Sequence, residues 1–201
     1  MLLKQLSDED ARVFVRVAEL LSLADKPILW NGKPRSEIAA KDIGSAKISL
    51  KRSEKQVAAM KELVLAVYAK GKDLDRYGSG FVDATNGESA RLEIESQLIT
   101  RIESLSLDSI DDPVCRMNIA RELLAATLRD KKAATPFVPK LMLFELMLFI
   151  LGDGGISVIQ WNLLDEFSRH YQVDDYIVHD LLERAEVTHQ EAQKTVAIIL
   201  E

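Results

Sequence analysis

Three acidic residues stand at positions that suit binding chemistry. Glu145 lies inside the most apolar run of the chain, residues 141–151, where a carboxylate is costly to bury unless it is paired or protonated. Asp25 and Asp153 each follow an apolar stretch and precede a helix break. Carboxylate oxygens are preferred ligands of hard divalent cations. We therefore predict that Asp25, Glu145 and Asp153 converge in one acidic pocket with a divalent metal ion as its cofactor. A structural salt bridge or a partly exposed helix face is the alternative for Glu145.

The remaining reactive side chains form no catalytic signature. The three histidines, His170, His179 and His189, include no pair at His-x3-His or His-Glu-x-x-His spacing, which predicts ordinary surface residues. The sequence has no phosphate-binding loop, dinucleotide fingerprint or nucleophile elbow. Cys115 is the only cysteine, so no intramolecular disulfide forms, and we expect it to be a small buried apolar side chain. These observations favour a protein without enzymatic activity.

The composition is that of a globular protein. Of the 201 residues, 47% are hydrophobic and 29% are charged, which suits one domain spanning residues 1–201. The formal net charge of −6 argues against a nucleic-acid partner. The apolar run 141–151 is shorter than the roughly 20 residues that cross a bilayer, and acidic residues from Asp8 onward argue against a signal peptide. We expect a cytoplasmic protein with no membrane span.

The charges are unevenly distributed along the chain. Residues 26–72 contain eleven Lys or Arg and four Asp or Glu, whereas residues 153–201 contain three and ten. This asymmetry is compatible with one basic and one acidic face. The alternative is that these charges solvate the outsides of helices.

Helical signals open the chain. Ser7 is a good N-cap, three acidic residues follow it, and an apolar stripe then runs over residues 13–24 until Pro27. A second helix is predicted from Ser53, with Gln56 at the capping-box position.

Two segments interrupt the helical pattern. Residues 26–48 contain prolines and glycines that break any long helix, and residues 71–87 contain four glycines that predict a loop. We interpret both as insertions. Further helices are predicted over residues 88–106 and from these start signals: Asp112-Pro113, Pro136, Ser157, Asp174 and Thr188. With no sustained strand-type alternation, the predicted class is all-α.

Two segments of the chain resemble each other at an offset of 128 residues. Residues 20–28 and 148–156 are identical at four of nine positions, and chance is the alternative explanation. The second segment continues as Gly152-Asp153-Gly154-Gly155-Ile156-Ser157 into an acidic amphipathic helix. This pattern resembles the TerB-like family, the tellurite-resistance-associated helical domain, most clearly over residues 1–30 and 136–201. The resemblance implies a compact multi-helix bundle with two weakly similar halves.

The resemblance also carries functional expectations. It implies a part in tellurite resistance and general stress responses, and acidic, metal-binding surfaces. The family pattern usually continues to a Glu four residues past the Ile, where this chain has Gln160 in one segment and Gly32 in the other. We expect a non-enzymatic helical interaction or sensor module with a protein partner. Two alternatives are a self-associating scaffold, which would form a homodimer, and a metal-dependent hydrolase, which lacks the Glu-x-x-His arrangement of di-metal bundles.

Overall fold

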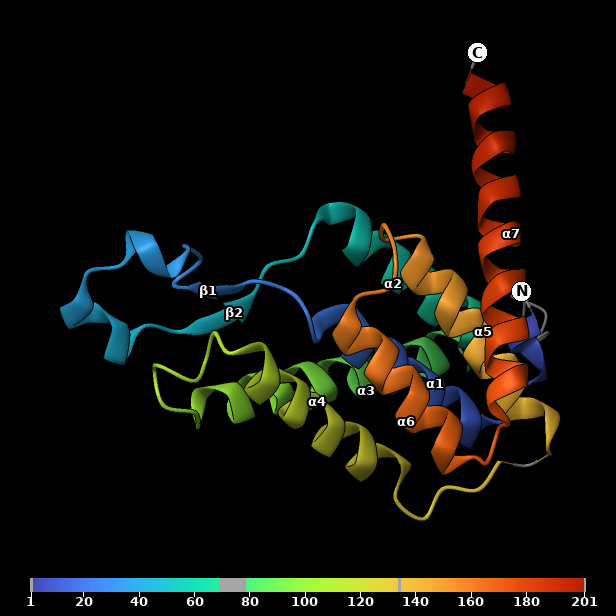
Figure 1. Ribbon diagram of the computed structural model, residues 1–201, viewed down its shortest axis with the longest axis horizontal. Helices are drawn as coiled ribbons and strands as arrows, with labels where there is room; N and C mark the ends of the chain where they lie inside the picture. The colour runs from blue at the N-terminus through green and yellow to red at the C-terminus, as the bar shows by residue number, and fades with distance from the viewer. Residues whose placement is uncertain (1, 69–78, 134, 201) are drawn as a thin grey trace.

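The computed structural model describes residues 2–68, 79–133 and 135–200, which contain seven α-helices, three short 3-10 helices and one short hairpin. Figure 1 shows the helices gathered into one body, from which the hairpin and the end of the longest helix project. The all-α class is therefore confirmed. None of the described helices is both long and apolar enough to cross a membrane. The elements are α1 (Asp8–Leu23), β1 (Ile28–Trp30), β2 (Ile48–Leu50), α2 (Glu54–Tyr68), α3 (Ser79–Glu103), α4 (Pro113–Leu128), α5 (Phe137–Leu151), α6 (Val158–His170) and α7 (Asp175–Leu200).

Helix α1 is the central element of the body. Its N-terminus is capped as predicted, because the Ser7 hydroxyl accepts a hydrogen bond from the Asp10 amide at 3.1 Å. The helix contacts α2, α3, α4 and α5. The apolar residues of the predicted stripe over residues 13–24 are buried, and they include Phe14 and Val15. The core thus surrounds α1, which also carries the fully buried carboxylate of Glu19.

Residues 27–51 form a projecting hairpin, which we call the arm (Figure 1). Strands β1 and β2 pair antiparallel, with Trp30 opposite Ile48. Asn31 and Gly32 both have positive φ, 50° and 78°, as expected for a tight Asn-Gly turn. Three-residue strands are too short to show alternation, which is why the sequence did not predict them. The arm overlaps the predicted insertion 26–48 and extends three residues past it, to residue 51. Its status as an insertion stays a prediction.

The predicted glycine-rich loop over residues 71–87 is wrong where the structure describes it. Residues 79–87 belong to helix α3, and residues 69–78 lie outside the described part. Gly87 shows why a glycine occurs within this helix. A Cβ atom there would lie 2.5 Å from Tyr68 Cε2 and 2.7 Å from Val64 Cγ1. The absent side chain lets α3 approach α2 closely, so this glycine serves packing rather than a turn.

The predicted helix start at Thr188 is also wrong. Helix α7 runs without interruption from Asp175 to Leu200. The Thr188 hydroxyl donates to the Arg184 carbonyl oxygen at 2.7 Å, one turn back along the same helix. Residues 189–200, which we call the outer half of α7, project beyond the other helices in Figure 1.

Candidate functional site

The turn between α5 and α6 presents Asp153. Gly154 and Gly155 have φ values of 117° and 127°, which side-chain-bearing residues rarely adopt. Ser157 then caps α6 and forms the predicted capping box with Gln160. These local features fix the turn, and they place the Asp153 carboxylate beside the end of α1 and the start of α2.

Asp153 is held by two partners from the first half of the chain. Lys26 Nζ lies 2.6 Å from Asp153 Oδ2 and 3.6 Å from Asp25 Oδ1. Gln56 Nε2 lies 2.7 Å from both Asp153 oxygens. Asp25 and Asp153 therefore share one partner, because the Lys26 ammonium contacts both carboxylates.

Arg116 of α4 fixes the position of Asp25 and Lys26. Its Nη2 donates to the carbonyl oxygens of Ala24 at 2.8 Å and Lys26 at 2.6 Å. A cation at the end of a helix satisfies carbonyl groups that have no partner within the helix. Burial lowers the pKa of Arg116, and the carboxylates of Asp25 and Asp111 oppose that effect.

Two adjoining hollows lie between α2 and α5. The Asp153 hollow, about 240 Å³, is lined by residues that include Gln56, Ile150 and Asp153. The Thr188 hollow, about 470 Å³, is lined by residues that include Leu63, Leu148 and Thr188. Both hollows share three lining residues: Ala59, Phe149 and Gly152. We call this continuous surface the α2–α5 groove. It is mainly apolar, and it extends from the start of α6 to α7.

Glu145, the third predicted ligand, lines only the Thr188 hollow. It is 5% exposed. Within residues 2–68, 79–133 and 135–200, no three His, Cys, Asp or Glu side chains are grouped as a metal site requires. The structure thus joins two predicted ligands through a lysine and assigns the third to the neighbouring hollow. A metal site on Asp25, Glu145 and Asp153 stays a prediction.

A buried charge network around Glu19 was not predicted from the sequence. Glu19 in α1 is 0% exposed, and its Oε1 lies 2.7 Å from Arg52 Nη2 and 3.0 Å from Arg91 Nη1. Arg91 also contacts Glu88 at 2.6 Å, and Arg52 contacts Glu95 at 2.6 Å. Burial raises the pKa of Glu19, although both arginines oppose it. The signal in the sequence was Glu19 itself, a carboxylate inside the apolar stripe of residues 13–24.

We assign the Glu19 network to stability rather than binding. It joins α1, α3 and the segment before α2, and its cations are matched by carboxylates from these same elements. Arg91 hydrogen-bonds to Glu88 and thereby lowers the pKa of Glu88. The centre of the network is buried, Glu88 and Glu95 are partly exposed, and none of its residues lines either hollow of the groove.

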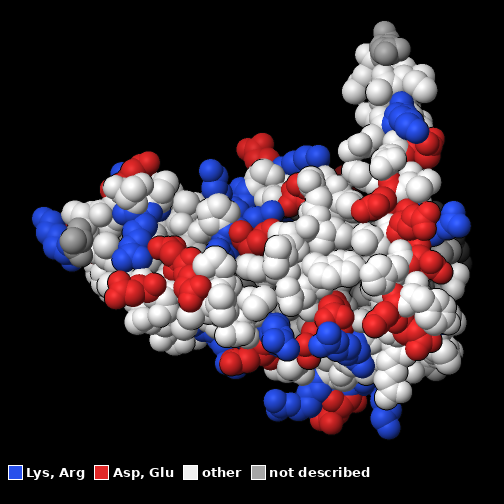
Figure 2. Space-filling model, viewed as in Figure 1, with Lys and Arg blue, Asp and Glu red and all other residues white. Residues whose placement is uncertain are grey.

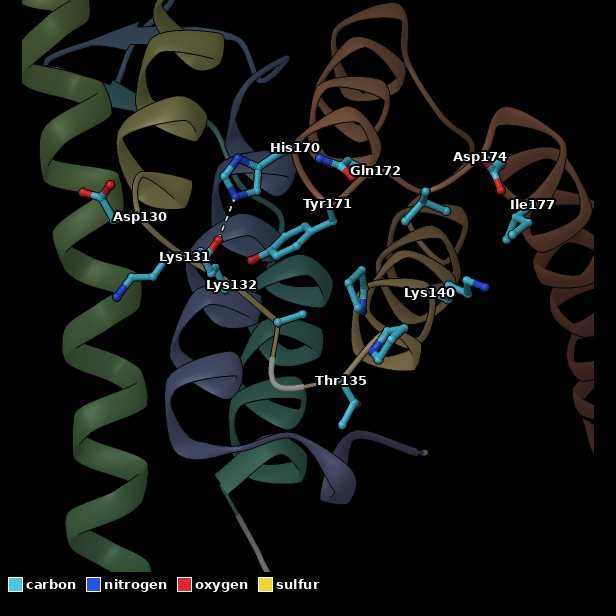
Figure 3. Close-up of a pocket in the computed structure, with 14 residues that line it drawn as sticks. Asp130, Lys131, Lys132, Thr135, Lys140, His170, Tyr171, Gln172, Asp174 and Ile177 are labelled. Atoms are coloured by element: carbon cyan, nitrogen blue, oxygen red, sulfur yellow. Dashed lines mark hydrogen bonds between the residues drawn. The ribbon is translucent and has the colours of Figure 1, made fainter.

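A third hollow lies on another side of the molecule, where α6 ends and α5 and α7 begin (Figure 3). It has a volume of about 700 Å³ and is lined by Lys131, Lys132, Lys140, His170 and Tyr171 among others. A ring nitrogen of His170 lies 3.0 Å from the Lys131 carbonyl oxygen, and the side chain of Lys131 pairs with Glu9 at 2.6 Å. Burial raises the pKa of Tyr171 to about 12, with Asp10 and Glu9 adding to the effect. These contacts join the loop that carries Lys131 to Glu9 of α1 and to His170 of α6.

The histidines and the cysteine lie apart from the groove. His170 and His179 are exposed, as predicted, and His189 is half-buried on α7. Cys115 is also half-buried rather than buried as predicted. Its thiol hydrogen-bonds to Asp112 at 3.3 Å, and this contact raises the pKa of the thiol. A raised pKa disfavours the reactive thiolate.

Basic and acidic side chains gather on different parts of the surface. Figure 2 shows Lys and Arg side chains at the far end of the arm and several Asp and Glu side chains along the base of α7. The fold is therefore an all-α body with an arm of mixed, partly basic character. No family model, no curated protein and no solved structure matches this chain.

Proposed function

We propose that this protein is a non-enzymatic helical interaction module that binds the apolar face of a helix in its α2–α5 groove. The observation that carries this proposal is the continuity of the two hollows, which share Ala59, Phe149 and Gly152. Two neighbouring helices offer a groove into which the side chains of a third helix can pack. An elongated, mainly apolar groove fits such a segment better than it fits a small polar substrate.

The charges around the groove support binding rather than catalysis. The Asp153 carboxylate is already engaged by Lys26 and Gln56, and these contacts hold one end of the groove in shape. The polar lining of the Asp153 hollow therefore serves to position the groove. The resemblance to the TerB-like family adds the expectation that the module acts in a cytoplasmic stress response of the tellurite-resistance type.

Ala59 offers a direct test because it lines both hollows and is exposed. The probe is a synthetic amphipathic helical peptide of Leu, Ala and Gln, titrated into isotope-labelled protein while backbone amide resonances are followed. We expect shifts concentrated in α2 and α5, lost in Ala59→Arg and retained in Ala58→Arg. Ala58 is the matched control, since it is exposed on the same helix and lines neither hollow. Shifts elsewhere, or equal shifts in both variants, would reject the proposal.

A further inference from the structure

Helix α7 carries one apolar stripe that continues past the body of the protein. Helices α5 and α7 pack together, and on α7 Val178 and Ala185 are buried and Leu182 is partly buried. At about 100° per residue, the same line continues along the outer half of the helix. Its members alternate steps of three and four residues, and all but His189 are apolar: Leu182, Ala185, His189, Ala192, Val196 and Ile199. The outer half therefore extends a face that already serves helix packing.

The outer part of this stripe is exposed. Val196 is 53% and Ile199 is 75% exposed, and Figure 1 shows this part of α7 standing clear of the other helices. Large apolar side chains gathered on one exposed face are typical of an interaction surface. The positions beside the stripe, Thr188, Gln193 and Thr195, carry no charge. Two such faces can therefore approach each other without charge repulsion.

We infer that the outer half of α7 pairs antiparallel with the same segment of a second copy, and that its end docks at the second copy's α2–α5 groove. This inference rests on the proposed function, because it names the occupant of the groove. The distance from Thr188 to Leu200 along the helix is about 18 Å at the usual rise per residue. Thr188 lines the groove. Antiparallel pairing over that length brings Leu200 of each copy to Thr188 of the other.

The outer half of α7 is too short to pair with its copy without the groove. The outer half contains fewer than two heptads, and a coiled coil is sustained by at least three or four. Docking of Ile199 and Leu200 at an apolar groove supplies the missing contact area. In the same register Ala192 lies opposite Val196 of the other copy, and the reverse contact follows by two-fold symmetry. The two central layers thus set a small side chain against a larger one, which favours close packing, and the two outer layers set His189 against Ile199.

The first test is the mass of the 201-residue protein by sedimentation equilibrium over micromolar concentrations. We expect twice the 22.5 kDa of one chain, and we expect Ile199→Glu and Ala59→Arg to give monomers. Two variants serve as controls: Val187→Glu on the opposite side of α7, where Val187 is 47% exposed, and Ala58→Arg. Both controls should remain dimeric. A dimer that survives Ile199→Glu or Ala59→Arg would overturn the inference.

The second test determines orientation by disulfide trapping in a Cys115→Ser background. Mixed Ala192→Cys and Val196→Cys proteins should cross-link to each other faster than either does to itself. Faster cross-linking within each single variant would indicate parallel pairing and overturn the inference. A wild-type protein that stays monomeric while the Leu, Ala and Gln peptide binds its groove would overturn the inference alone. A monomer that also fails to bind the peptide would overturn the proposed function as well.

Discussion

Gln56 and Gln160 make equivalent connections between the two helical pairs α1–α2 and α5–α6. Each glutamine closes a capping box, because its Oε1 accepts a hydrogen bond from the serine amide three residues earlier, at 2.8 and 2.9 Å. Each Nε2 then reaches the other pair. Gln56 donates to Asp153, and Gln160 donates to the Leu21 carbonyl oxygen at 3.0 Å.

This relationship corrects one sequence correspondence. Gly32 was matched to Gln160 by counting residues from the Ile, but Gly32 lies in the turn of the arm. With the arm set aside, Gln56 stands where Gln160 stands in the other pair. The matched segments also end their helices at corresponding residues, Leu23 of α1 and Leu151 of α5. The two-halves hypothesis remains a prediction, now with a specific structural correspondence to support it.

Gln160→Ala is expected to destabilise the protein by about 2 kcal/mol. Gln160 is 2% exposed, so its loss breaks a capping box and leaves the buried Leu21 carbonyl oxygen without this donor. Urea unfolding followed by circular dichroism measures the change. Gln97→Ala is the control, because Gln97 is exposed on α3 and its loss should cost less than about 0.5 kcal/mol. Equal effects from the two substitutions would show that the buried hydrogen bond to Leu21 contributes nothing.

The features predicted from the sequence were local ones. Capping boxes at Ser53 and Ser157 depend on residues three positions apart, so their sequence signal is complete. The Glu19 network instead depends on Arg52 and Arg91, which only the tertiary fold brings to α1. At Thr188 a local signal was misleading. The residues from Thr188 onward resemble a helix cap, but the Thr188 hydroxyl donates to the Arg184 carbonyl oxygen within a continuous helix.

Only the parts of the candidate site that have a local sequence signal were predicted. The glycine turn and Asp153 were evident from the motif, and Asp25 was found through the internal match. Lys26 was not recognised as their shared partner, because charge pairing across an offset of 127 residues has no local signal. The groove itself is lined by residues of both α2 and α5, whose relative placement periodicity does not specify.

Arg91→Met should destabilise the protein strongly, by about 3–5 kcal/mol at neutral pH, because it leaves Glu19 buried with one fewer cation. Burial already raises the pKa of Glu19. A carboxyl group with a raised pKa in the folded state favours folding at low pH, and this contribution is lost as the pH rises through that pKa. The loss caused by Arg91→Met should therefore be smaller at pH 4 than at pH 7.

Urea unfolding of Arg91→Met at several pH values gives the required free energies. Arg101→Met is the control, because Arg101 lies on the same helix as Arg91 and its pair with Glu122 of α4 is exposed. Exposed pairs contribute at most about 1 kcal/mol. A loss for Arg91→Met that is independent of pH would exclude Glu19 as the group left unpaired.

Gly87→Ala should destabilise the protein by about 1–3 kcal/mol, as overpacking does. The new methyl group would overlap Tyr68 and Val64 between α2 and α3. Gly44→Ala is the matched control, since a Cβ at Gly44 meets no atom within 4 Å. Thermal unfolding distinguishes the two substitutions, and a Gly87→Ala protein as stable as the wild type would mean that the helices are not in close contact there.

In Tyr171→Phe the free energy of unfolding should fall less steeply with rising pH, above pH 10, than in the wild-type protein. The pKa of Tyr171 is raised from 10.0 to about 12 in the folded protein, chiefly by burial. Its contribution is fully present below pH 10 and is lost as the pH rises toward 12, because the unfolded chain ionises first. The wild-type free energy of unfolding should fall more steeply than that of Tyr171→Phe over this range. Parallel curves would mean that the phenol ionises equally in both states.

The most direct test of the α2–α5 groove as a binding surface is the affinity of the Leu, Ala and Gln peptide for Ala59→Arg and Ala58→Arg, measured by titration calorimetry. We predict a Kd at least about tenfold higher for Ala59→Arg, a difference of about 1.4 kcal/mol. The Kd of Ala58→Arg should equal that of the wild-type protein. Equal affinities for the two variants would contradict the assignment of this groove as the binding site.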